Sequence, residues 1–258
     1  MLIFQPAEER ATGAKAMLGD RVFSAGKPQA IFAVHTAPLN VGQLGTAPGG
    51  LMAGRDFVEV RLTGDGNLSA AADSVRRIIE SVGTVTPAQA IQPGPPSAVF
   101  AQARPTTGPS AGEGSRVEGS ITTASAVSRA RAKETVLRRL AELELPRVSV
   151  KPSYQEKAIA GVTNDSGLVR RANARVKAVL GEGAVIAIET IPPAFSEDFG
   201  SFQDEVPGVM YFLGVSNPAK GWVGMPHSPG YVADDAAILV GARAMAAVIL
   251  DLLINRSE

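Results

Sequence analysis

A change of hydrophobic pattern near residue 56 constrains the fold more than any other feature of this sequence. Before it, short apolar runs alternate with a helical stretch, as in α/β domains. From Phe57 to Leu62, apolar residues then alternate with Glu59 and Arg61, the pattern of a strand with one exposed face. The turn-forming run 63–67 follows. The sequence therefore predicts that a second, separate sheet begins here.

The segment that follows has the element order of a ferredoxin-like unit, β-α-β-β-α-β. After the strand at 57–62 we expect a helix at 70–82, strands at 98–103 and 117–122, a helix at 126–142 and a strand at 148–154. Proline- and glycine-rich stretches at 87–96 and 104–114 predict loops. We predict that residues 53–155 form an inserted α+β lid or dimerisation domain.

Residues 1–52 and 156–258 are predicted to form one α/β catalytic domain around that insertion. Its first part predicts a strand at Leu2–Phe4, a helix at 14–18, a strand at 30–34 and an extended piece at 41–52. Its second part predicts a helix from the capping residues 163–166 to Leu180, a strand at 209–213 and an apolar helix at 234–253.

Composition argues against several classes of protein. Lys and Arg total 25, as do Asp and Glu, so no net field favours nucleic acid or an anionic membrane surface. The chain has no cysteine, which excludes disulfides, Cys-ligated zinc and a cysteine nucleophile, and a reducing compartment, the cytoplasm, is expected. The first ten residues have neither the basic flank nor the apolar length of a signal peptide or anchor.

Four ionisable residues lie next to predicted strand ends, where loops usually present functional groups. His35 follows the apolar run 30–34, and His227 lies in a proline-rich loop; they are the two histidines of the chain. Glu8 and Glu9 follow the apolar run that begins the sequence. On an extended backbone, one carboxylate of such a pair can bind a metal while the other faces the attacking water. Lone histidines and acidic pairs are more often structural or solvated, so their context must decide.

That context consists of short motifs in a fixed order. They are Phe4–Glu9, Gly13–Met17, Val34–His35 and Gly49–Ala53 before the predicted insertion, and Ser196–Phe199, Val206–Val209, Phe212–Gly214, Pro226–His227 and Asp234–Asp235 after it. Together they resemble the peptidase M20 family of amidohydrolases, which hydrolyse N-acyl amino acids and related amides. The resemblance spans nearly the whole chain and is weakest across residues 65–116.

The resemblance implies a partial zinc-peptidase-like catalytic domain, a divalent metal (zinc or manganese) and roles for the four residues. Glu8 matches the general base, which takes a proton from water and gives it to the leaving amine. Glu9 matches a metal-ligand glutamate, and His35 and His227 match metal-ligand histidines. A small N-acyl amino acid or peptide would be the substrate, and two copies would pair through the inserted lid.

The sequence also departs from the family pattern. Family members carry further ligands in an N-terminal segment before Gln5, which this sequence lacks, so at most three side-chain ligands are expected: Glu9, His35 and His227. Three ligands can hold one zinc ion, whereas the dinuclear centre of the family needs more. In the inserted unit, Leu68 stands where the family has a histidine, and 110–116 is a Gly/Ser-rich run.

Three interpretations stay open at this point. The chain is an M20-type hydrolase, either part of a longer protein or half of a split enzyme completed by another chain. Alternatively, it is a non-catalytic fragment or remnant that keeps the fold and acts through dimerisation. A third, blander possibility is an unrelated α/β protein whose acids and histidines are structural, which the agreement of several ordered motifs disfavours.

Overall fold

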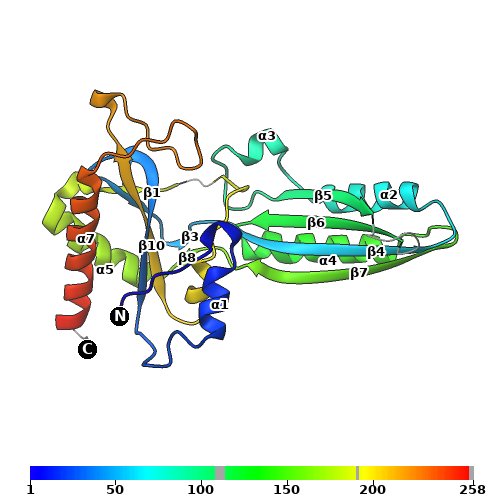
Figure 1. Cartoon of the computed structure of the whole chain (residues 1–258), viewed down its shortest axis with the longest axis horizontal. Helices are drawn as coiled ribbons and strands as arrows, with labels where there is room; N and C mark the ends of the chain where they lie inside the picture. The colour runs from blue at the N-terminus through cyan, green and yellow to red at the C-terminus, as the bar shows by residue number, and fades with distance from the viewer. Residues whose placement is uncertain (108–113, 190–191, 256–258) are drawn as a thin grey trace.

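The computed structural model describes residues 1–107, 114–189 and 192–255, and it contains two bodies built on separate sheets (Figure 1). The first has a four-stranded sheet of order β1-β10-β2-β9. Strands β1 (Ile31–Asn40) and β10 (Gly208–Ser216) are parallel, β2 (Leu44–Thr46) is antiparallel to β10, and β9 (Val185–Ala187) is parallel to β2. A short antiparallel pair, β3 (Gly49–Gly50) and β8 (Thr163–Asn164), lies beside it. The result is the mixed α/β fold that the sequence predicts.

Strand β10 is nearly uniformly apolar because helices cover both faces of its sheet. On one face, Val209 and Tyr211 pack with α5 (Ser166–Leu180) and α7 (Ala236–Ile254). On the other, Met210 packs with α1 (Gly13–Gly19) and with Phe202 of α6 (Gly200–Gln203). Three short 3-10 turns complete this body, η1 (Glu8–Arg10), η2 (Glu182–Ala184) and η3 (Pro218–Lys220). The sheet is therefore the middle layer of three.

The second body has the predicted β-α-β-β-α-β order. Its antiparallel sheet, of order β5-β6-β4-β7, consists of β4 (Gly54–Gly64), β5 (Phe100–Thr107), β6 (Ser115–Thr123) and β7 (Val148–Ile159). Helices α2 (Leu68–Glu80) and α4 (Ala126–Ala141) cover one face, with Val75, Ile79 and Val136 fully buried against Val60. The opposite face carries Glu59 and Arg61, so the alternation from which this sheet was predicted does separate a buried face from an open one.

Helix α7 packs one side onto the first sheet and exposes the other. Its buried residues include Ala237, Ala244 and Val248, and its buried Asp251 is paired with Arg171 of α5 at 2.6 Å. The helix is long and apolar enough to cross a membrane by length and composition alone. Its most apolar 18-residue stretch has a mean hydropathy of 2.2, and 28% of that stretch is buried. Core helices pass the same test, but α7 packs on α5 and β10 with one side only and leaves Ile238, Leu239 and Ile254 exposed.

Some element predictions are wrong in detail. Residues 1–7 form no strand, because no described segment pairs with them, and Phe4 is 84% exposed. Strand β1 continues past Val34 to Asn40, so His35 lies within a strand and does not follow one. The loop predicted at 87–96 contains α3 (Pro87–Ala90), which begins with a capping box between Thr86 and Gln89. Strand β5 extends into the predicted loop 104–114, whose residues 108–113 lie outside the described ones.

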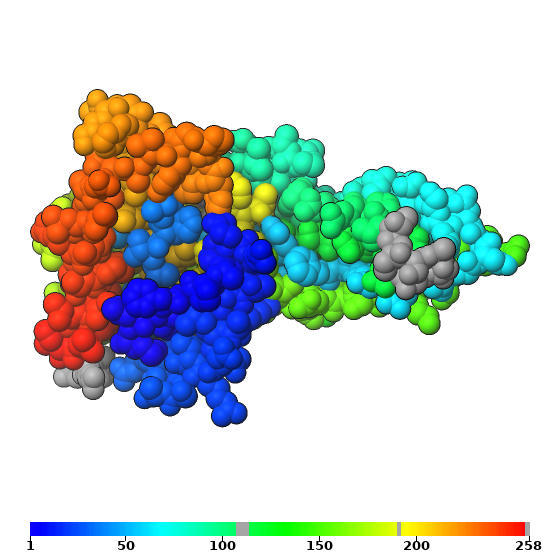
Figure 2. Space-filling model, in the orientation of Figure 1, coloured from blue at the N-terminus to red at the C-terminus, as the bar shows by residue number. Residues whose placement is uncertain are grey.

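The N-terminal segment crosses the front of the molecule and touches α1 closely (Figure 2). Gly13, at the start of α1, lies so near Pro6 that an added Cβ atom would sit 1.6 Å from the Pro6 carbonyl oxygen. Gly19, at the other end of α1, has open space around the same position. Only glycine at position 13 therefore allows the segment preceding Glu8 to pack on α1.

We expect Gly13→Ala to lower the melting temperature by several degrees, because Pro6 or α1 must move to admit the new methyl group. Gly19→Ala is the matched control in the same helix. It should be neutral or stabilising by about 0.5–1 kcal/mol, since alanine loses less backbone entropy on folding. Thermal unfolding followed by circular dichroism measures both, and equal melting temperatures for the two variants would contradict the close packing.

Candidate active site

Asp198 joins the N-terminal segment to the body of the first domain. Its Oδ1 accepts a hydrogen bond from Gln5 Nε2 at 2.5 Å, and its Oδ2 accepts one from the Ala14 backbone N–H at 3.0 Å. Ala14 is fully buried and Asp198 is 1% exposed, so the bond to Ala14 is shielded from bulk water, whereas the bond to Gln5 is partly buried. The contact holds the chain on both sides of η1, the turn that carries Glu8 and Glu9.

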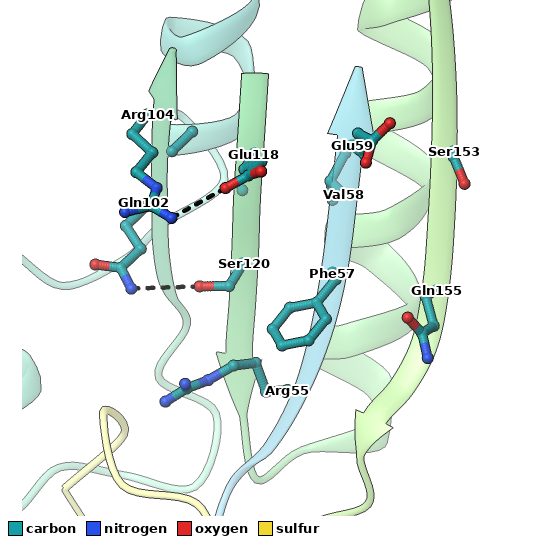
Figure 3. A pocket seen from close by; sticks show the side chains of 12 residues that line it. Arg55, Phe57, Val58, Glu59, Gln102, Arg104, Glu118, Ser120, Ser153 and Gln155 are labelled. Carbon is teal, nitrogen blue, oxygen red and sulfur yellow. Dashed lines mark hydrogen bonds and ion pairs between the residues drawn. The ribbon is translucent and has the colours of Figure 1, made fainter. Parts of the chain in front are cut away.

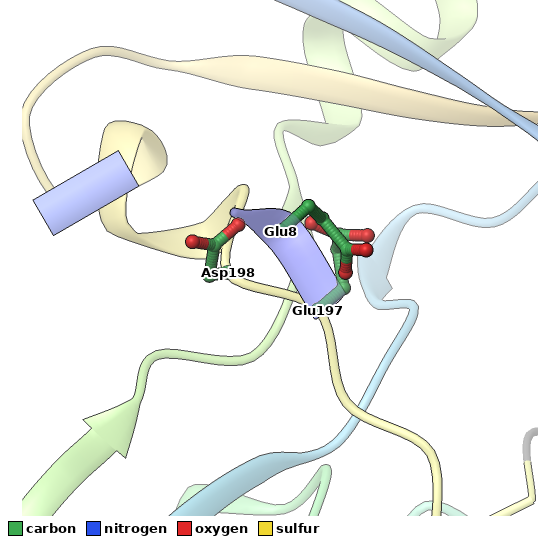
Figure 4. A group of neighbouring side chains, drawn as sticks. All are labelled: Glu8, Glu197 and Asp198. Atoms are coloured by element: carbon green, nitrogen blue, oxygen red, sulfur yellow. The ribbon is translucent and has the colours of Figure 1, made fainter. Parts of the chain in front are cut away.

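Three carboxylates gather at this point (Figure 4). Glu8 from η1 meets Glu197 and Asp198, which precede α6, and one oxygen atom from each lies within 4.8 Å of the others. In the part of the chain that the structure describes, they are the one group of three or more Asp, Glu or His side chains close enough to share a metal ion. The cluster therefore concentrates negative charge beside the predicted general base.

The buried carboxylate of this cluster holds its proton unusually tightly. Glu197 is 4% exposed, and burial raises its pKa to about 8, with the neighbouring charges of Glu8 and Asp198 adding to the effect. A hydrogen bond of 3.0 Å from the Phe199 backbone N–H opposes the shift. Since two close carboxylates cannot both ionise cheaply, Glu197 is protonated near neutral pH and can donate a hydrogen bond to Glu8.

Glu9 and His227 approach each other from opposite ends of the sequence. Their Oε2 and Nδ1 atoms lie 3.7 Å apart, and both side chains are largely exposed, at 74% and 66%. His227 has a φ of 59°, in the left-handed region that residues with a Cβ atom rarely adopt. The loop thus accepts local backbone strain to bring His227 over Glu9, a pattern frequent at functional sites.

His35 is half-buried on the edge strand β1. Its Nδ1 atom lies 2.6 Å from the Thr36 carbonyl oxygen, and its ring packs edge-on against Phe212. A carbonyl accepts only, so Nδ1 carries the hydrogen and Nε2 keeps a lone pair. A backbone carbonyl that accepts a hydrogen bond from one ring nitrogen often orients an imidazole whose other nitrogen binds a metal.

The four predicted site residues therefore do not form one group in the structure. Glu8 joins Glu197 and Asp198, Glu9 joins His227, and His35 forms no three-residue ligand group with Glu9 and His227. Their roles as base and metal ligands stay predictions. From the sequence, Glu197 and Asp198 had no predicted role beyond their place in the motif 196–199; the available signal was two adjacent acids shortly before a helix.

The raised pKa of Glu197 predicts a specific pH dependence. The folded chain keeps this proton to about pH 8, whereas an ordinary glutamate loses it near 4.5. The unfolded state therefore binds fewer protons between these values, and stability falls as pH rises through that window. In chelator-treated protein, we expect Glu197→Gln to reduce the fall in melting temperature between about pH 5 and about pH 8, because the amide mimics the protonated acid.

Glu205→Gln is the matched control, because Glu205 lies on the surface and pairs with Lys27. It should leave the pH profile of the melting temperature unchanged. A Glu197→Gln profile parallel to that of the wild type would show that Glu197 is already ionised in the folded protein.

Comparisons with known proteins show what this chain is similar to. At the level of sequence, an N-acetyldiaminopimelate deacetylase of Bacillus licheniformis is 31% identical over 84% of this chain and 60% of its own length. An IAA-amino acid hydrolase of Arabidopsis thaliana is 27% identical over 96% of this chain and 54% of its own length. The chain therefore spans little more than half the length of these relatives.

The fold has solved counterparts as well. The YXEP protein of Bacillus subtilis, described as a dinuclear metal binding peptidase from the M20 family, superposes with a TM-score of 0.72 at 23% identity. The superposition covers 98% of this chain and 64% of that one. Residues 1–251 also match the family described as Peptidase family M20/M25/M40. With the fold, the ordered motifs and this match in agreement, the chain belongs to the M20 peptidase family.

Proposed function

We propose that this chain supplies the general base and three metal ligands of a metal-dependent amidohydrolase that cleaves the amide bond of small N-acyl amino acids. The observation that carries the proposal is the division of adjacent carboxylates: Glu8 contacts Glu197 and Asp198, while Glu9 faces His227. Relatives named as a deacetylase and an amino acid hydrolase support amide hydrolysis as the chemistry.

Glu9 and His227 fit two ligands of a divalent metal, and His35, which lies apart from this pair in the structure, is proposed as the third. Two ligands on a tetrahedral zinc ion, at ~2.1 Å each, lie about 3.4 Å apart, close to the 3.7 Å between Glu9 and His227. The His35 tautomer leaves Nε2 available as a third donor. When bound, such an ion would polarise the amide carbonyl and acidify water.

Glu8 then has the position of the proton carrier. It lies three residues after Gln5, which Asp198 anchors, so its carboxylate is adjacent to the proposed ligand Glu9 in the sequence and beside Glu197 and Asp198 in space. Burial raises the pKa of Glu197, so its carboxyl group can donate a hydrogen bond to Glu8 and orient the Glu8 carboxylate that is proposed to accept a proton from water. Glu8 can later return that proton to the leaving amine.

We further propose that the second body, residues 54–159, acts as the lid and dimerisation domain. Both of its outer strands, β5 and β7, have one edge unpaired among the described residues, so either can extend the sheet into a second copy. A homodimer in the cytoplasm, with zinc or manganese, is the form we propose.

The metal assignment predicts a clear difference between neighbouring residues. In calorimetric zinc titrations, Glu9→Ala, His35→Ala and His227→Ala should each abolish binding, because each removes one of three ligands. Glu8→Ala should bind zinc as the wild type does and abolish hydrolysis of N-acetyl amino acids, since it removes only the base.

Glu205→Ala, a surface change away from the cluster, serves as the control and should alter neither quantity. Zinc retention by His227→Ala would overturn the ligand assignment. Hydrolysis by Glu8→Ala at the wild-type rate would overturn the assignment of the base.

A further inference from the structure

A cavity of about 660 Å³ lies on the open face of the second sheet, away from the acidic cluster (Figure 3). Its floor consists of side chains from four neighbouring strands: Arg55, Phe57 and Glu59 from β4, Gln102 and Arg104 from β5, Glu118 and Ser120 from β6, and Ser153 and Gln155 from β7. Its size is typical of small-molecule sites. The cavity combines charged, amide, hydroxyl and aromatic groups, so it is suited to a small polar ligand with an apolar part.

The charges in this cavity are unevenly compensated. Arg104 pairs with Glu118 at 3.0 Å, which neutralises both. Arg55 has no carboxylate within ion-pair distance in the part of the chain that the structure describes. Glu59 lies on the same strand face, but four residues of extended chain separate the two by about 13 Å. The end of the cavity near Arg55 is therefore positive.

Arg55 is also partly removed from water. Burial lowers the pKa of its guanidinium, which nevertheless stays charged at neutral pH. Its Nε donates to Thr122 Oγ1 at 3.3 Å, and its Nη2 donates to the Ala194 carbonyl at 3.0 Å. Both partners are neutral, so these bonds use two of five N–H groups and leave the charge without a counterion. A half-buried, unpaired cation is costly unless an anion compensates it.

We propose that the cavity binds a small carboxylic acid carrying an aryl or alkyl group, with the carboxylate on Arg55. The guanidinium can form charge-assisted, bidentate hydrogen bonds with a carboxylate. Phe57, 44% exposed in the cavity, provides the apolar contact, and the Gln102 amide and Ser120 hydroxyl, 3.4 Å apart, can pair with an amide group. N-acyl amino acids meet this description, and only this choice of probe rests on the proposed function.

The same arginine links the cavity to the acidic cluster. Ala194, whose carbonyl accepts from Arg55, lies three residues before Glu197 in the sequence. The backbone N–H of Ala194 also donates to Ala90 of α3, at the rim of the second body. A carboxylate on Arg55 thus binds next to the segment that leads into Glu197 and Asp198.

The test is a binding measurement that needs neither metal nor turnover. N-acetylphenylalanine and its carboxamide, N-acetylphenylalaninamide, are titrated into the chelator-treated chain and followed by NMR. We expect the acid to bind at least about tenfold more tightly than the amide, because charge-assisted hydrogen bonds are roughly twice as strong as neutral ones. Shifts should centre on Phe57 and Ser120.

Arg55→Gln keeps an amide donor toward Ala194 and removes the charge. It should weaken binding of the acid about tenfold and leave the amide unaffected. Arg61→Gln is the matched control on the same face of β4 but outside the cavity lining, and it should change neither, because Arg61 is exposed to solvent. Equal affinities of the wild type for acid and amide, unchanged binding by Arg55→Gln, or shifts away from Phe57 would overturn the proposal.

If Arg55→Gln does not fold, the wild-type comparison of acid with amide decides alone. Because chelated protein cannot hold the acid through a metal ion, a positive result reports the Arg55 cavity and not the metal site. A chain that fails to hydrolyse amides can still pass this test, and a hydrolase can fail it, so the two proposals are judged separately.

Discussion

The buried carboxylate of Asp198 is the contact on which the candidate site depends. It accepts hydrogen bonds from Gln5 on one side of η1 and from the first turn of α1 on the other. Residues 1–7 form no strand and have little packing of their own, so without this contact the position of Glu8 would be set by few other interactions. Gly13 contributes by letting Pro6 lie directly on α1. A few buried contacts thus replace a strand ladder in positioning the predicted base.

Around this anchor, neighbouring carboxylates are placed in very different surroundings. Asp198 is buried and accepts from two donors, Glu197 is buried with one donor, and Glu9 is exposed beside His227. Environment therefore raises the pKa of Glu197 and gives the acids different partners, although the residue types are nearly identical. In other sites with paired acids, different surroundings likewise move the pKa values of the two groups apart.

Much of the fold could be predicted from local pattern. The strand at 57–62, the helices α2, α4 and α5, and the last helix follow from periodicity and capping residues, which act over a few positions. The strand expected at Leu2–Phe4 failed because an extended run needs a pairing partner, and periodicity does not report partners. Glu197 and Asp198 were not assigned a role for a similar reason. Asp198 is bonded to Gln5, 193 positions away, and Glu197 lies beside Glu8, and burial of a carboxylate depends on such long-range packing.

The two ends of the second body lie next to each other. Arg55 pairs with Ile159 across β4 and β7, and Gly161 lies so close that an added Cβ atom would sit 2.4 Å from the Gly54 backbone nitrogen. The second body also has its own apolar core, separate from those of the first. A segment that enters and leaves at one point behaves like a long loop for its host. The gene can therefore lose, gain or exchange this module in one step without breaking the sheet that holds β1 and β10.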